Sequence, residues 1–103
     1  MIPSEFQIQG CTWRVRWRDI ADPTWAAEKC WGVTYFEATG PEIHLDVSLR
    51  ADPTKLREIW IHELLHACFP SLKKVDEKLE EKIVQQTAPL LASVLNQFGW
   101  DAV

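Results

Sequence analysis

The chain has 103 residues, of which 47% are hydrophobic and 25% are charged, and its formal net charge is -4 at pH 7. This length and composition favour one packed domain over residues 1–103 and exclude multidomain, repeat and disordered architectures. Nucleic acids and anionic membranes attract cationic surfaces, so the negative charge also argues against both as partners.

Residues 11–18 predict a β-strand, because apolar residues alternate there with threonine and arginine at a period of two. This pattern gives the strand one apolar face and one cationic face. Phe6 and Ile8 indicate a partner strand before Gly10. The tryptophans of the strand lie on the face opposite the arginines, so the pattern does not indicate a nucleic-acid-binding surface.

Residues 31–37 and 42–48 flank the turn-forming segment 38–41, Ala-Thr-Gly-Pro, and predict a hairpin. The apolar residues of its second strand share one face. His44 and Asp46 lie on the other face, where we expect polar side chains to be solvated. Together, these strands predict a small antiparallel sheet.

Two helices are expected in the second half of the chain. At the start of the first, Asp52 and Pro53 form the pattern of an N-cap followed by proline, and Pro70 ends that helix near Phe69. The last turns of this helix are apolar nearly all round, which is typical of a helix buried between two layers.

The second helix is expected from about Asp76 to Phe98, with an apolar stripe at helical spacing. The stripe consists of Ile83, Val84, Thr87, Leu91, Val94, Leu95 and Phe98. Pro89 falls on the opposite, solvent-facing side and is expected to kink the helix. The predicted fold class is α+β, in which a small antiparallel sheet with a hairpin precedes two packed helices.

The sequence contains no recognisable targeting or membrane segment. Residues 1–7 lack the basic stretch and apolar run of a secretory signal or transit peptide, which predicts a cytoplasmic protein. The most apolar run, residues 59–68, is short and is interrupted by two histidines and a glutamate, so it does not predict a membrane span.

Three cysteines without CxxC spacing predict reduced thiols that are buried or half-buried. These residues are Cys11, Cys30 and Cys68.

The first helix contains the motif HExxH, formed by His62, Glu63 and His66. Two histidines four positions apart lie on one helical face with Cβ atoms about 5–6 Å apart, so both imidazoles can reach one zinc ion. Glu63 projects about 100° further round the helix, beside the metal. A carboxylate in that position can accept a proton from water and pass it to a leaving amine, which makes Glu63 the candidate general base.

A catalytic zinc ion needs a third protein ligand, and no histidine follows His66. This excludes the metzincin pattern and leaves the carboxylates of the second helix. At about 100° per residue, Glu80 lies on the midline of the apolar stripe, where a buried carboxylate is costly unless a cation compensates it. We therefore expect Glu80 as the third ligand, with Glu77 and Glu81 as alternatives. An acidic residue here is also favoured by the helix N-terminus alone.

The pattern resembles the small metallopeptidase domains of the ImmA/IrrE and SprT-like kind, especially the short forms common in phage and prophage genomes. The resemblance covers the predicted hairpin, residues 57–67 with the HELLHA core, and residues 80–84. It implies a gluzincin-like zinc site with His62 and His66 as ligands, Glu63 as general base and a glutamate of the following helix as third ligand. This sequence departs from the longer gluzincins, in which that glutamate lies further from the motif along the chain than it does here.

The expected function is zinc-dependent hydrolysis of peptide bonds in a polypeptide substrate, with Glu63 as the base. One alternative is a non-catalytic protein-binding module, such as a phage factor acting on a host or repressor protein, in which zinc only locks the helices together. Another is a metal-free structural component. His44 or Tyr35 is a candidate donor to the oxyanion that develops during hydrolysis, or else a solvated residue of the sheet.

Overall fold

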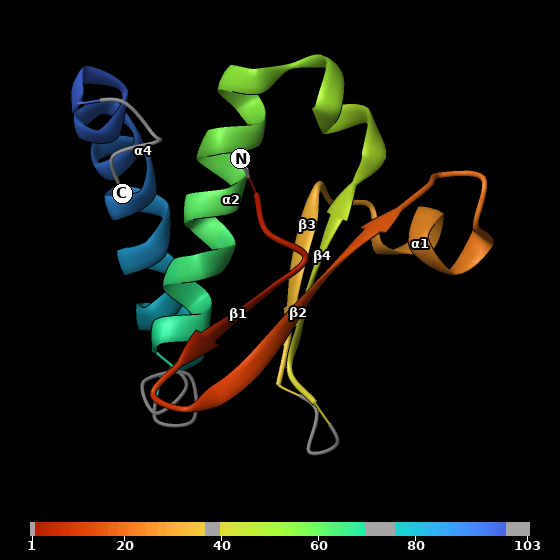
Figure 1. Cartoon of the computed structure of the whole chain (residues 1–103), viewed down its shortest axis with the longest axis horizontal. Helices are drawn as coiled ribbons and strands as arrows, with labels where there is room; N and C mark the ends of the chain where they lie inside the picture. Colours follow the sequence, from red (N-terminus) through yellow and green to blue (C-terminus); the bar gives the residue numbers. More distant parts are fainter. Residues whose placement is uncertain (1, 37–39, 70–75, 99–103) are drawn as a thin grey trace.

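The computed structural model describes residues 2–36, 40–69 and 76–98, so Pro70 and the first half of the predicted turn 38–41 lie outside the described residues. The strands are β1 (Glu5–Ile8), β2 (Cys11–Arg18), β3 (Gly32–Tyr35) and β4 (Glu42–Asp46). The helices are α1 (Pro23–Glu28), the 3-10 helix η1 (Val47–Ala51), α2 (Pro53–Cys68) and α4 (Glu77–Phe98). The strands form one sheet, α2 packs against that sheet, and α4 lies alongside α2 (Figure 1). The predicted α+β class is confirmed.

The sheet is mixed and has the strand order β1-β2-β4-β3. β1 pairs antiparallel with β2, and β3 pairs antiparallel with β4, as the sequence patterns predicted. β2 and β4, however, are parallel, with Val15 opposite Ile43 and Trp17 opposite Leu45. The prediction of an antiparallel sheet is therefore wrong at its centre. A parallel pair needs a long crossover, which here includes α1 and β3, and local patterns carry no signal for such a pairing.

The short helix α1 was not predicted, although its start repeats that of α2. Both helices begin at the proline of the sequence Ala-Asp-Pro-Thr, and in both the aspartate is the N-cap. Asp22 accepts a hydrogen bond from the Thr24 N–H, and Asp52 accepts one from the Lys55 N–H. α1 places Trp25 in a buried position, with only 2% of its surface exposed.

β4 is buried on both faces, so the prediction that His44 and Asp46 are solvated is wrong. These residues are only 8% and 7% exposed. Trp25 covers this face, and its Nε1–H donates a hydrogen bond to Asp46 Oδ2 at 2.8 Å. The ring of Tyr35 also lies edge-on against His44. The other face of β4 belongs to the main core, which consists of Trp13, Val15, Ile43, Leu45, Leu49, Trp60 and Ala67.

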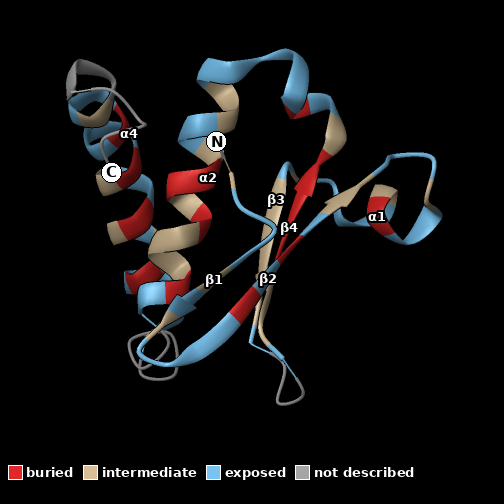
Figure 2. Ribbon diagram, in the orientation of Figure 1, coloured by how far each residue is buried: buried red, intermediate tan, exposed pale blue. Residues whose placement is uncertain are grey.

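α4 has a narrow row of buried residues at every fourth position. Figure 2 marks the buried residues of this helix in red. The row consists of Glu80, Val84, Ala88 and Ala92. The predicted stripe is right for Val84 but wrong for Leu91 and Val94, which are 36% and 47% exposed, because the small alanines form the contact instead. Pro89 is exposed, as predicted, and the helix continues through it. The side chain of Phe98 lies outside the described part of the structure.

All three cysteines are free. Cys30 is half-buried, as expected, whereas Cys11 and Cys68 are exposed, which corrects the prediction for those two residues. Cys68 is the last residue of α2, where the helix leaves the core. Within the described ranges, the structure contains no helix long and apolar enough to cross a bilayer.

Candidate metal centre

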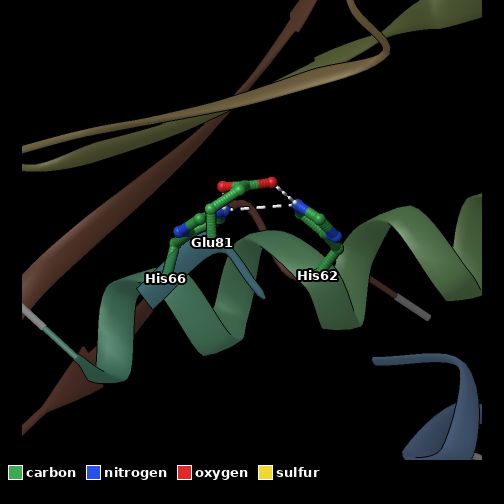
Figure 3. Close-up of side chains that lie close together, drawn as sticks. All are labelled: His62, His66 and Glu81. Atoms are coloured by element: carbon green, nitrogen blue, oxygen red, sulfur yellow. Dashed lines mark hydrogen bonds and ion pairs between the residues drawn. The ribbon is translucent and has the colours of Figure 1, made fainter. Parts of the chain in front are cut away.

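The two histidines of the HExxH motif project together from α2 (Figure 3). The continuous helix places His62 and His66 one turn apart, with their ring centroids separated by 4.9 Å. Their Nε2 atoms lie 3.2 Å from each other. Two nitrogen donors therefore point toward one place, as the spacing of the motif predicted.

Glu81 reaches these nitrogens from the first turns of α4 (Figure 3). Its Oε2 lies 2.9 Å from His66 Nε2, and its Oε1 lies 3.4 Å from His62 Nε2. Among the described residues, the metal-binding atoms of His62, His66 and Glu81 lie within 4.8 Å of one another. Glu81 is thus the residue through which α4 contacts the Nε2 atoms of both histidines of the motif.

Glu80 lies on the other side of His66. Its carboxylate is only 1% exposed, and its Oε1 contacts His66 Nδ1. The side chain is buried, as the stripe geometry predicted, but it approaches the imidazole nitrogen that faces away from His62. This placement favours Glu81 over Glu80 as the third ligand. Glu77, the other alternative, lines the adjoining cavity.

The three donors match a zinc ion by type, and they lie close enough together to share one ion. Two histidines and one glutamate are a common ligand set of catalytic zinc. Donor atoms held at about 2.0–2.1 Å from a tetrahedral zinc ion lie about 3.3 Å from one another. The two Nε2 atoms are 3.2 Å apart, close to that value. Each of them lies near a different oxygen of Glu81, His66 Nε2 at 2.9 Å from Oε2 and His62 Nε2 at 3.4 Å from Oε1. With one donor atom from each residue, the group lies within 4.8 Å and could hold a divalent cation.

Glu63 lies beside the histidines and is 5% exposed. Thr34 of β3 donates a hydrogen bond from its hydroxyl to Glu63 Oε1 at 2.8 Å, and the same hydroxyl lies 3.1 Å from the Glu63 main-chain oxygen. Burial raises the pKa of Glu63 above its ordinary value, and this effect outweighs the Thr34 hydrogen bond and the two histidines, which lower the pKa. Glu63 therefore holds a proton more strongly than an exposed glutamate does.

A cavity of about 350 Å³ joins these groups. Its lining includes Thr34 from β3, Glu63 and both histidines from α2, and Glu77, Glu80 and Glu81 from α4. Gly32 lets β3 approach α2 closely, because a Cβ atom there would lie 3.0 Å from Glu63 Cγ and 3.1 Å from Ile59 Cγ2. The candidate ligands and the candidate base therefore line one cavity.

The two candidate oxyanion donors lie elsewhere. His44 Nδ1 is 2.9 Å from Arg18 Nη1, and His44 Nε2 is 2.9 Å from Glu42 Oε1. Because the guanidinium of Arg18 only donates, His44 Nδ1 accepts its hydrogen bond and the Nε2–H donates to Glu42. Tyr35 packs against this ring, and neither residue belongs to the described lining of the cavity. The geometry does not support an oxyanion role for them.

Sequence reasoning missed Thr34 and Gly32. Both residues act across the space between β3 and α2, and their roles depend on the packing of these two elements. A small residue and a hydroxyl in an otherwise apolar strand were the only signals available.

Comparisons of the chain with protein-family models, with curated proteins and with solved structures each found no match. The resemblance to the ImmA/IrrE and SprT-like domains therefore stays a prediction based on the motif. Function has to be inferred from the geometry of the site.

Proposed function

We propose that this protein is a zinc-dependent peptidase in which His62, His66 and Glu81 hold the metal and Glu63 is the general base. The observation that supports the proposal is the convergence of three zinc-type donors, within 4.8 Å of one another, beside a buried carboxylate in one cavity. When bound, zinc supplies a Lewis acid that acidifies water and polarises a carbonyl group.

Glu63 moves the proton in this proposal. Its Oε1 is occupied by the hydrogen bond from Thr34, which leaves Oε2 to accept a proton from water in the cavity. The same oxygen then returns the proton to the amine that leaves when the peptide bond breaks.

The position of the cavity suits an extended polypeptide as substrate. β3 lies at one end of the strand order, so one of its edges has no neighbouring strand in the described sheet. Its residues Gly32, Val33 and Thr34 line the cavity beside the candidate base. An extended chain that pairs with a free strand edge gains main-chain hydrogen bonds and passes the site in a fixed register.

The experiment that tests the proposal is the substitution Glu63→Gln, assayed with a labelled unfolded protein as substrate. We expect the variant to lower the cleavage rate by about 10²–10⁴-fold, because the amide cannot accept the proton. Zinc content is expected to stay that of the wild type. Glu58→Gln, at an exposed position of the same helix, is the matched control and is expected to retain cleavage. Undiminished cleavage by the Glu63→Gln variant would contradict the proposed base.

One observation favours the second candidate function, a protein-binding module with a structural zinc ion. The donors come from two helices, so a bound cation would tie α2 to α4. Under this alternative, the wild type cleaves nothing, and a chelator lowers the melting temperature. The cleavage assay therefore separates the two functions.

A further inference from the structure

We infer that Glu80 is a positioning residue for the metal centre, because its carboxylate fixes the orientation and the proton of His66. This inference rests on the proposed function, since it concerns the same zinc site. Under this inference the two consecutive glutamates of α4 have different roles: Glu81 is a metal ligand, and Glu80 orients the ligand His66.

The burial of Glu80 calls for a partner. A carboxylate that is only 1% exposed loses its hydration, and this loss is costly unless a hydrogen bond or an opposite charge replaces the water. The partner is His66, whose Nδ1 contacts Glu80 Oε1. Glu80 also lies in the row of α4 side chains that is buried together with Val84 and Ala88. Its position is therefore set by helix packing as well as by the histidine.

The contact decides which nitrogen of His66 is free. An ionised carboxylate has only acceptors, so the hydrogen between Glu80 and His66 belongs to Nδ1. In a neutral imidazole the lone pair is then on Nε2. That nitrogen is the one that lies 3.2 Å from His62 Nε2 and 2.9 Å from Glu81 Oε2. Glu80 thus aims the lone pair of His66 at the place where the other two donors meet.

The geometry of α4 explains why two adjacent glutamates can share this work. Successive residues of an α-helix point about 100° apart. Glu80 points into the contact with α2, whereas Glu81, whose side chain is 42% exposed, points to the cavity. The two carboxylates consequently contact opposite nitrogens of one ring. An outer carboxylate of this kind fixes the ring and raises the basicity of the ligating nitrogen.

The test measures the zinc dissociation constant by competition with a chromophoric chelator. We expect Glu80→Gln to weaken zinc binding by about 10–100-fold, because outer partners of ligating histidines contribute that much. Glu58→Gln, which removes an exposed carboxylate of α2 that does not line the cavity, is the matched control and is expected to leave the constant unchanged. Glu81→Gln removes a ligand and is expected to weaken binding more than Glu80→Gln does.

Each other outcome overturns the inference. If the wild type binds zinc tightly and Glu80→Gln has the same dissociation constant, the inference about Glu80 is wrong, whereas the proposed function is not affected. A loss in Glu80→Gln greater than that in Glu81→Gln makes Glu80 the ligand itself. A wild type that binds no zinc overturns the proposed function together with this inference.

A second measurement uses the unmodified protein and so does not depend on the folding of a variant. Nitrogen-15 spectra of the imidazoles in the zinc-loaded wild type are expected to show His66 protonated at Nδ1 and ligated through Nε2. Ligation of His66 through Nδ1 would overturn the inference, because Glu80 could not then hold that nitrogen.

Discussion

At the scale of single residues, the adjacent carboxylates of Glu80 and Glu81 contact opposite nitrogens of His66. The helical angle of Glu80 placed it correctly on the buried face of α4. The ligand that we propose, Glu81, lies instead at the border of this face, where its side chain lines the cavity and contacts His66 Nε2. A pattern with 100° steps cannot resolve this difference, because it depends on how far α4 is displaced along α2.

A substitution of Thr34 tests the candidate base, because the Thr34 hydroxyl donates a hydrogen bond to the buried carboxylate of Glu63. Thr34→Val keeps the shape of the side chain and removes the donor. Hydrogen bonds to charged groups contribute about 1.5–3 kcal/mol, so we expect kcat to fall by about 10–100-fold with little change in KM. Steady-state kinetics measure both constants. Thr34→Ser restores the hydroxyl and is expected to restore kcat. Equal activity of the valine and serine variants would contradict this role.

At the scale of elements, the strands and helices that have a clear local pattern in the sequence were predicted well. The period of two identified β2, and the HExxH helix was found together with its N-cap at Asp52. The same N-cap signal at Asp22 was overlooked because α1 is only six residues long and has no apolar stripe. The parallel pairing of β2 with β4 could not be predicted, because it joins strands separated by another helix and strand.

A substitution of Asp46 tests how much the contacts between elements stabilise the fold. Its carboxylate accepts hydrogen bonds from Trp25 of α1 and from the Ser48 N–H of η1. Asp46→Asn places an amide N–H against one of these donors. We expect a loss of about 1–3 kcal/mol in the free energy of unfolding near neutral pH. Urea denaturation measures this loss. Glu58→Gln, at an exposed position, is the control and is expected to change stability by less than about 0.5 kcal/mol.

The effect of Asp46→Asn is also expected to depend on pH. Burial raises the pKa of Asp46, but the hydrogen bonds from Ser48 and Trp25 outweigh it and hold the pKa below its ordinary value. Stability from such a group is fully present above the pKa of the unfolded chain, about 3.9, and is lost as the pH falls through the lower pKa of the folded state. The difference between wild type and variant should therefore shrink below about pH 4. A difference that grows with acidification would contradict the assignment.

At the scale of the whole molecule, the proposed metal centre lies where three elements meet: α2 supplies two of the candidate donors, α4 supplies the third, and β3 donates a hydrogen bond to the candidate base. The cavity at this junction is lined by four glutamates and by no lysine or arginine among the described residues. A divalent cation would relieve the repulsion between these carboxylates. The motif predicted the donors of α2, but the meeting of the three elements follows only from the packing.

The central claim is that His62, His66 and Glu81 together bind one zinc ion, and elemental analysis of the purified protein after dialysis against zinc tests it most directly. The account predicts about one zinc ion per chain for the wild type, as a single three-ligand site requires, and none for His62→Ala. Glu58→Gln should match the wild type. A wild type without zinc, or a His62→Ala variant with the zinc content of the wild type, would contradict the account.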